Sequence, residues 1–150
     1  MFINFKHEHK CFNLRVASVI KKDEKILLAR DMDYYTLPGG RVFFGETTEA
    51  ALKRVLLEEL NVIVKIIKLL SINENFFDYE EDQYHELLFV YLCEIETENN
   101  EEIKEDFVSH KQKSYNYIST KELMNVNFKP GFLLGDLKNM TNDILHNVNK

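Results

Sequence analysis

The chain has 150 residues, of which 45% are hydrophobic and 29% are charged, and its net charge is −6. This length and composition fit one domain spanning residues 1–150 and exclude general disorder. An acidic chain has no global positive field, so we expect no nucleic-acid partner. Apolar runs are far shorter than the roughly 20 residues that span a bilayer. The first ten residues lack an apolar secretion signal. We therefore expect a cytoplasmic protein without a membrane partner.

Two cysteines, Cys11 and Cys93, are too few for a disulfide framework. Neither has a nearby partner at metal-ligand spacing. We expect both to be buried thiols in a reducing compartment.

The predicted elements begin with a strand hairpin formed by residues 13–20 and 25–30, which is followed by a helix at 47–60. Strands before, between and after helices indicate a mixed sheet with helices on its faces. In the rest of the chain we expect strands at 62–72, 86–95 and 115–118, a loop or hairpin tip at 76–83, a solvated loop at 96–106, a helical turn at 120–125 and a C-terminal helix at 130–148.

Glycine and proline concentrate in one segment of this chain. Of five glycines and two prolines, Gly39, Gly40, Gly45 and Pro38 all lie within LPGGRVFFG. So much turn chemistry in one place predicts an unusual backbone path. The predicted helix follows directly, and Thr47 or Thr48 is placed to cap it.

The far end of this helix carries charge of the unexpected sign. Glu58 and Glu59 lie in the last turn, where each acid costs about 0.3–1 kcal/mol against the helix dipole unless something compensates. At about 100° per residue, Arg54 stands close to Glu58. A solvated acidic helix end is one interpretation. The other is a bound divalent cation, for which oxygen ligands favour Mg²⁺ or Mn²⁺ over zinc. The opposite side should face the core and holds Leu52, Leu56 and Leu60.

Residues Gly40–Val62 resemble the Nudix box, the signature of hydrolases that act on nucleoside diphosphates linked to another group. That pattern reads G, five residues, E, seven residues, R-E-U-x-E-E-x-G-U, with U an aliphatic residue. The lead-in Leu37-Pro38-Gly39 is similar as well. The resemblance implies a single MutT-like domain of the α/β class, a Nudix-type α/β/α sandwich with a mixed β-sheet. The matching positions are Gly40, Glu46, Arg54, Leu56, Glu58, Glu59 and Val62.

Two positions depart from the pattern. Asn61 replaces a glycine, which is a mild change because asparagine tolerates the left-handed conformation expected after a helix. Val55 replaces the glutamate that follows the arginine. On the helical wheel Val55 sits between Glu58 and Glu59, so it removes one carboxylate from the expected metal face.

The resemblance assigns roles to the box residues and their neighbours. Metal binding falls to Glu58 and Glu59, with Glu46 and the Gly40 carbonyl nearby, and the ion would be Mg²⁺ or Mn²⁺. Arg54 is expected to pair with box carboxylates and orient them for catalysis; phosphate contact is the lesser alternative. For substrate binding we name Arg41, as a phosphate contact, and Tyr79, at a position where some relatives keep a tyrosine.

The general base is left open by Val55. Glu59 could serve if metal lowers the pKa of a bound water. Otherwise the base lies outside the box, and Glu86 is the first choice, followed by Glu80, Glu81 and Asp82. His85 is expected to have a structural or surface role rather than a catalytic one.

These residues predict a Mg²⁺- or Mn²⁺-dependent hydrolase that cleaves a pyrophosphate bond in a nucleoside diphosphate derivative. The substrate would be a small nucleotide-type molecule, and a homodimer is possible. The alternative is a Nudix-fold nucleotide-binding or regulatory domain whose catalysis Val55 has weakened.

Overall fold

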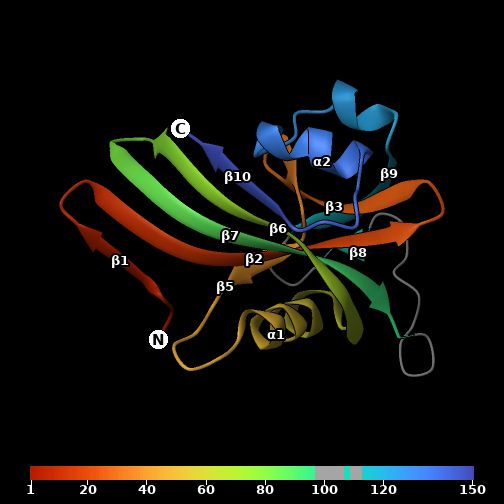
Figure 1. The fold of residues 1–150 in the computed structure, drawn as a ribbon, viewed down its shortest axis with the longest axis horizontal. Coiled ribbons are helices and arrows are strands. Elements are labelled where there is room, and N and C mark those ends of the chain that lie inside the picture. The colour runs from red at the N-terminus through yellow and green to blue at the C-terminus, as the bar shows by residue number, and fades with distance from the viewer. Residues whose placement is uncertain (97–106, 109–112) are drawn as a thin grey trace.

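The computed structural model describes residues 1–96, 107–108 and 113–150. These residues form a single body of strands with helices on two sides (Figure 1). The elements are, in chain order, β1 (Asn4–His7), β2 (Lys10–Lys22), β3 (Lys25–Asp31), β4 (Tyr34–Thr36), β5 (Gly39–Arg41), α1 (Thr48–Leu60), β6 (Val64–Tyr79), β7 (Asp82–Ile95), β8 (Phe107–Val108), β9 (Ser114–Ser119), the 3₁₀ turns η1 (Glu122–Asn125) and η2 (Gly131–Leu133), α2 (Leu134–Lys138) and β10 (Leu145–Asn149).

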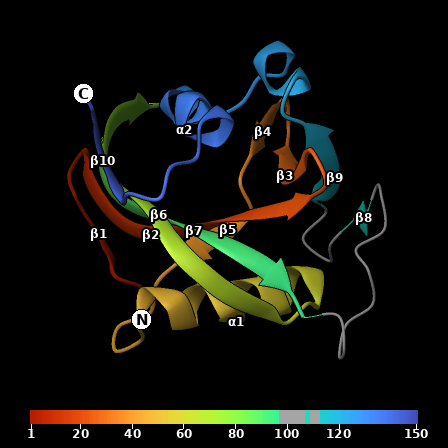
Figure 2. The same cartoon turned by 45° about the vertical axis from the view of Figure 1, so that its right-hand side comes forward.

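The strands of the described part build a mixed sheet in the order β10-β6-β7-β2-β3-β9-β8. Strand β2 runs parallel to β7 and β10 runs parallel to β6, whereas the other pairs are antiparallel. Short strands β1 and β5 also pair with β2, and β4 pairs with β3. Helix α1 lies against one face of the sheet and α2 on the opposite side (Figure 2). The expected α/β/α sandwich with a mixed sheet is confirmed.

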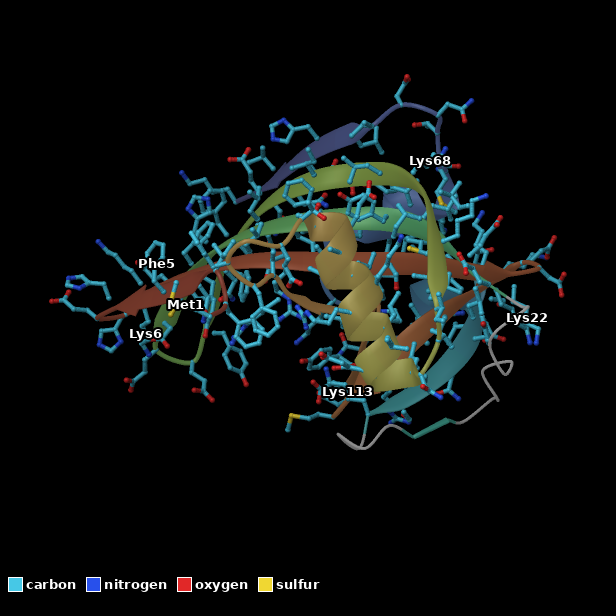
Figure 3. The ribbon with its side chains drawn as sticks, turned by 90° about the horizontal axis from the view of Figure 1, so that it is seen from below. Met1, Phe5, Lys6, Lys22, Lys68 and Lys113 are labelled. Carbon is cyan, nitrogen blue, oxygen red and sulfur yellow. The ribbon has the colours of Figure 1, made fainter. Side chains whose placement is uncertain are left out.

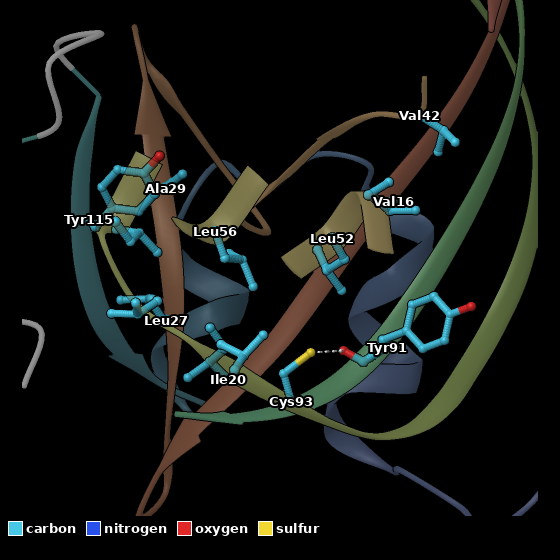
Figure 4. Packing of buried hydrophobic residues seen from close by; sticks show 14 residues of the cluster. Val16, Ile20, Leu27, Ala29, Val42, Leu52, Leu56, Tyr91, Cys93 and Tyr115 are labelled. Carbon is cyan, nitrogen blue, oxygen red and sulfur yellow. Dashed lines mark hydrogen bonds between the residues drawn. The ribbon is translucent and has the colours of Figure 1, made fainter. Parts of the chain in front are cut away.

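Alternation along the strands divides the core into two layers. Val16 and Ile20 of β2 face α1, whereas Ala17 and Val19 point to the side of α2. Helix α1 fills the first layer with Leu52, Leu56 and Leu60, as its periodicity predicts. Figure 4 shows Leu52 and Leu56 within this layer. The buried thiols are also as predicted: Cys11 and Cys93 are free and buried, and burial raises the pKa of Cys93 to about 12.

The ends of α1 follow local rules. Thr47 caps the first turn, because its hydroxyl accepts a hydrogen bond from the Ala50 N–H at 3.1 Å. Asn61 ends the helix in the left-handed region, with φ of 54°, and its N–H donates to the Leu57 carbonyl at 3.0 Å. The replacement of glycine by asparagine therefore keeps the expected conformation.

The hairpin of β2 and β3 turns where expected, and η1 and β9 confirm the predicted helical turn and short strand. The predicted loop or hairpin tip at 76–83 is a tip only at residues 80–81, because β6 and β7 extend to either side of it. Apart from Glu96, the predicted loop at 96–106 lies outside the described residues.

The predicted C-terminal helix at 130–148 is wrong. Only Leu134–Lys138 is α-helical, and Leu145–Asn149 forms strand β10 beside β6. Side-chain amides on β10 bind amides on β6, and this tertiary pairing overrides local helix propensity. No helix in the described part of the chain is long and apolar enough to cross a membrane.

The core packing of α1 gives a first prediction. Leu56 is fully buried, so Leu56→Ala should lower the free energy of unfolding by about 2–5 kcal/mol. Leu57 is 49% exposed on the same helix, and Leu57→Ala should change it by less than about 1 kcal/mol. Urea unfolding followed by circular dichroism measures both. Equal losses in the two variants would contradict the observed helix orientation.

Candidate active site

The glycine turn brings helix α1 onto the backbone of β5. A Cβ atom at Gly39 would lie 2.1 Å from the Val16 carbonyl oxygen, and one at Gly40 would lie 2.9 Å from Cγ2 of Val55. Both glycines are therefore required by close approach rather than by positive φ, which among the described glycines occurs only at Gly45. Val55 is buried in this contact. An apolar side chain thus occupies the seam between the helix and the turn.

Arg54 organises the charges beside this seam. Its Nε and Nη2 donate to the two carboxylate oxygens of Glu46 at 3.2 and 2.7 Å, and Nη2 also donates to the Arg41 carbonyl at 2.9 Å. Nη1 reaches Glu58 at 3.4 Å. The guanidinium lies 4.1 Å from the ring centroid of Phe43, so a cation–π contact holds its plane. The predicted pairing of Arg54 with box carboxylates is confirmed.

Glu46 is held on both of its oxygens. Besides the two bonds from Arg54, Oε1 accepts the Phe43 N–H at 2.7 Å. The Arg54 hydrogen bonds, helped by the Phe43 N–H, lower the pKa of Glu46 although partial burial opposes this. Glu46 is therefore an ionised carboxylate that closes the glycine turn.

The two glutamates at the end of α1 differ in environment. The Glu58 side chain is 54% exposed and touches Arg54. Glu59 is buried, and its Oε2 accepts a hydrogen bond from the Tyr115 hydroxyl of β9. Adjacent helix positions lie about 100° apart, so the two carboxylates leave the helix in different directions. Among the residues that the structure describes, no three acidic, histidine or cysteine side chains converge closely enough to form a metal cluster.

The chemistry of the donors nevertheless fits a hard divalent cation. Mg²⁺ in phosphate-handling sites takes one or two carboxylates and completes its shell with water and substrate phosphate. Glu58 and Glu59 supply two carboxylates, and the Gly40 backbone supplies a carbonyl on the neighbouring strand. Val55 lies where the family pattern has a third acid, so this chain offers one carboxylate fewer at that end of α1.

A cleft of about 540 Å³ opens on the face of the sheet away from α1. This volume suits a small-molecule site. Its walls come from β2, β3, β4, β6, β7 and β10, from Lys113 before β9 and from the segment that precedes α2, and they include Gly39 of the glycine turn. Side chains available to a ligand are Arg15, Asp31, Tyr34, Asn75, Phe77, Asp78, Tyr79, Glu86, Lys113, Lys129 and Asn149.

Glu86 is the buried acid of this cleft. It lies on β7 opposite Asn13 of β2 and Asn75 of β6, and its Oε2 is 4.0 Å from Nε of Arg15. Burial raises the pKa of Glu86, and Arg15, Asn75 and Arg41 oppose that rise only in part. A carboxyl group with a raised pKa in a cleft has the properties of a general base.

The other base candidates lie elsewhere. Glu80 and Glu81 are exposed at the tip of the β6–β7 hairpin. Asp82 is ion-paired with Lys6, which Figure 3 shows near the protruding end of the sheet, and lies 3.3 Å from Nδ1 of His9. His85 packs on the ring of Phe76 at 4.3 Å, on the opposite face of the sheet from Glu86.

Of the two predicted substrate-binding residues, Tyr79 lines the cleft and Arg41 lies beside it. Tyr79 lines the cleft and is 59% exposed, which leaves its ring accessible. Arg41 is beside the cleft residue Arg15, its register partner across β2 and β5, and its charge acts on Glu86.

Several cleft residues had no sequence signal. Arg15, Asn75 and Asn149 come from three strands and are brought together by sheet register, whereas Lys129 comes from the loop before η2, where its N–H donates to the Tyr35 carbonyl at 2.8 Å. Tyr34 reaches Asp31 at 3.5 Å and has Lys129 over its ring at 5.0 Å, so the far wall is also charged and aromatic.

Known structures share this architecture. A MutT protein from Bacillus halodurans is 17% identical with a TM-score of 0.71, over 89% of this chain and 86% of that chain. A NUDIX hydrolase from Nitrosomonas europaea is 19% identical with a TM-score of 0.65, over 84% and 86%. An ADP-ribose pyrophosphatase from Streptococcus suis is 15% identical with a TM-score of 0.62, over 91% and 98%. At such identities the likeness shows the fold.

A search of curated proteins finds no match. The NUDIX domain family matches residues 12–133, which include the whole glycine turn, helix α1 and Glu86. The resemblance carried by Gly40–Val62 is thereby confirmed. This chain belongs to the NUDIX domain family.

Proposed function

We propose that this protein hydrolyses a pyrophosphate bond in a nucleoside diphosphate derivative with the help of Mg²⁺ or Mn²⁺. Membership of the family supports pyrophosphate-bond hydrolysis in general. The observation that carries the proposal is the cleft, which places a buried acid, Glu86, beside Arg15 and is also lined by Gly39, the residue directly before the box.

The walls of the cleft suit a nucleotide. Phosphate is an anion, and Arg15, Lys113 and Lys129 bring positive charge to a chain whose net charge is −6. The exposed ring of Tyr79 offers a stacking surface for a base, and Arg41 at the rim offers a phosphate contact. A nucleotide-type small molecule therefore fits better than a nucleic acid.

In this proposal Glu86 is the general base. Glu86 accepts a proton from water as the water oxygen bonds to phosphorus, and the bridging P–O bond breaks with its electron pair on the departing phosphate. Arg15, 4.0 Å from Glu86, helps to keep the carboxylate ionised before the proton moves. Glu59 is the weaker candidate for base because the Tyr115 hydroxyl already engages one of its oxygens.

The metal ligands in this proposal are Glu58, Glu59 and the Gly40 carbonyl. A divalent cation there would neutralise charge on phosphoryl oxygens of a substrate that extends from the cleft past Gly39 toward the end of α1. Both oxygens of Glu46 are used by Arg54 and Phe43, so we assign Glu46 to orienting Arg54 rather than to direct metal binding. Arg54 in turn steadies Glu58.

A second candidate function is a nucleotide-binding or regulatory domain with weakened catalysis. Burial of Val55 against Gly40 favours it, because this side chain fills the seam where the family pattern has an acid. The two functions share the cleft and differ only in turnover.

The experiment that separates them is a panel of nucleoside diphosphate derivatives with Mg²⁺ or Mn²⁺. We expect release of phosphate or a nucleoside monophosphate from at least one member. Glu86→Gln should lower kcat on that substrate by about 10²–10⁴-fold, because a general base contributes about that much. No turnover across the panel, with ligands still raising the melting temperature, would support the binding domain.

The metal assignment predicts a difference between acids. Glu58→Gln and Glu59→Gln should weaken Mn²⁺ binding, measured by isothermal titration calorimetry, by at least about 10-fold, since each removes an ionised oxygen ligand. Glu46→Gln should change the Mn²⁺ affinity by less than about 3-fold. Equal weakening of Mn²⁺ binding in all three variants would instead make Glu46 a ligand.

The Arg54–Glu46 pair also predicts how stability depends on pH. Because Arg54 lowers the pKa of Glu46, the ionised pair stabilises the fold above pH about 4.5, and that stability is lost as pH falls through the lowered pKa. Urea unfolding should therefore show that Glu46→Gln loses less stability in acid than the native protein does.

Restoring the missing acid gives a further prediction. Val55→Glu places a carboxylate in a buried contact with Gly40, so without metal the melting temperature should fall by several degrees. Adding Mn²⁺ should raise the melting temperature of Val55→Glu by more than it raises that of the native protein, since a third carboxylate joins the site. Val55→Gln is the matched control, because it has similar size and no charge. A gain in turnover with Val55→Glu would show that the missing acid limits catalysis, and the same Mn²⁺ response in both variants would contradict a metal at this seam.

A further inference from the structure

Two asparagines of β10 stand in register with two of β6. In this parallel pair Asn147 lies opposite Asn73, and Asn149 lies opposite Asn75. Nδ2 of Asn147 donates to Oδ1 of Asn73 at 2.7 Å, and Nδ2 of Asn149 donates to Oδ1 of Asn75 at 2.9 Å. Figures 1 and 2 both show β10 along the edge of β6. Each β10 amide therefore fixes which way a β6 amide is turned.

The orientation of Asn75 matters because of its other neighbour. An amide oxygen only accepts hydrogen bonds and an amide nitrogen only donates them. Since Asn149 engages the oxygen of Asn75, the NH₂ group of Asn75 is left for its second partner. That partner is Glu86, which lies directly opposite Asn75 in the register of β6 and β7. Hydrogen bonding from the Asn75 side chain lowers the pKa of the Glu86 carboxyl against the effect of burial. Both residues are buried, with 5% of Asn75 and 8% of Glu86 exposed.

We propose that Asn149 is a positioning residue for Glu86. By holding the amide oxygen of Asn75, it makes Asn75 present a donor rather than an acceptor to the carboxylate. Strand β10 thereby fixes which group of Asn75 faces Glu86, which lies two strands away from β10 in the sheet. The inference rests on the proposed function in one respect, the role of Glu86 as base, and the experiment below separates the two.

Other charges also face Glu86 and do not depend on this amide chain. Arg15 of β2 lies at 4.0 Å with 37% of its side chain exposed, and Arg41 of β5 acts from the rim. A change at Asn149 leaves these charges in place, so its effect on Glu86 passes through Asn75. Elsewhere in the walls of the same cleft the titratable groups are Asp31, Tyr34, Asp78, Tyr79, Lys113 and Lys129.

The test is a carboxyl ¹³C NMR titration of Glu86 in the full chain, with the resonance assigned by its absence in Glu86→Gln. Asn149→Ala frees the Asn75 amide to turn, so the titration midpoint should rise by about 0.5–1 pH unit, because the charged form loses a hydrogen bond. Asn149→Asp should raise it further. An aspartate only accepts, so the Asn75 NH₂ turns toward it and leaves its oxygen against Glu86.

Asn147→Ala is the matched control. Asn147 lies one pleat along the same strand and donates to Asn73 and Asp136 instead, so its loss loosens β10 without turning Asn75. The Glu86 midpoint should stay at its native value in this variant. Equal shifts in Asn147→Ala and Asn149→Ala, or no shift in either Asn149 variant, would overturn the inference.

Kinetics then separate the inference from the proposed function. Where a substrate is turned over, the acid limb of kcat/KM should move to higher pH in Asn149→Ala, because a base must lose its proton before it acts. A shifted NMR midpoint with an unshifted acid limb would leave the positioning role intact and show that Glu86 is not the base. The NMR midpoint also tests the inference in the absence of any turnover.

Discussion

Helix α1 rests directly on the bare backbone of β5, and the geometry of the site follows from that contact. No Cβ atom fits at Gly39 or Gly40, because a carbonyl of β2 lies on one side and Val55 of the helix on the other. The close approach brings the acidic end of the helix, the glycine carbonyl and the turn that ends at Glu46 into one region. Leucines on the buried face of α1 anchor the helix to the sheet and so maintain the approach.

The acidic side chains at this junction are paired with Arg54 or with a hydroxyl group. The last turn of α1 holds two acids and no basic residue, an arrangement that opposes the helix dipole. Arg54 offsets part of this by contacting Glu58 and by fixing Glu46, while the Tyr115 hydroxyl stabilises Glu59 from β9. These contacts fix the orientation of Glu46, Glu58 and Glu59.

Sequence periodicity predicted what depends on near neighbours in the chain. The helix, its threonine cap, its buried leucines and the Arg54–Glu58 pair all follow from spacings of four residues or fewer. The cleft does not, because its groups come from β2, β6, β7 and β10, and their proximity is set by strand register. The same reason explains the wrong C-terminal helix: residues 145–149 read locally as part of a helix, yet their amides match those of β6. Glu86 was found as a candidate only because it opens a strong strand pattern.

The cleft gathers basic side chains in one place on an acidic protein. A net charge of −6 is spread over the surface, whereas Arg15 and Lys129 line one concave space. Coulomb interactions fall off within about 8–10 Å in physiological salt, so local charges outweigh distant ones. In this cleft, whose walls also hold Asp31 and Asp78, Glu86 is harder to ionise than an exposed glutamate, since burial outweighs the nearby guanidinium groups. Hydrogen bonds from buried amides are not screened in this way, and this gives a neutral residue such as Asn75 real influence over a charged one.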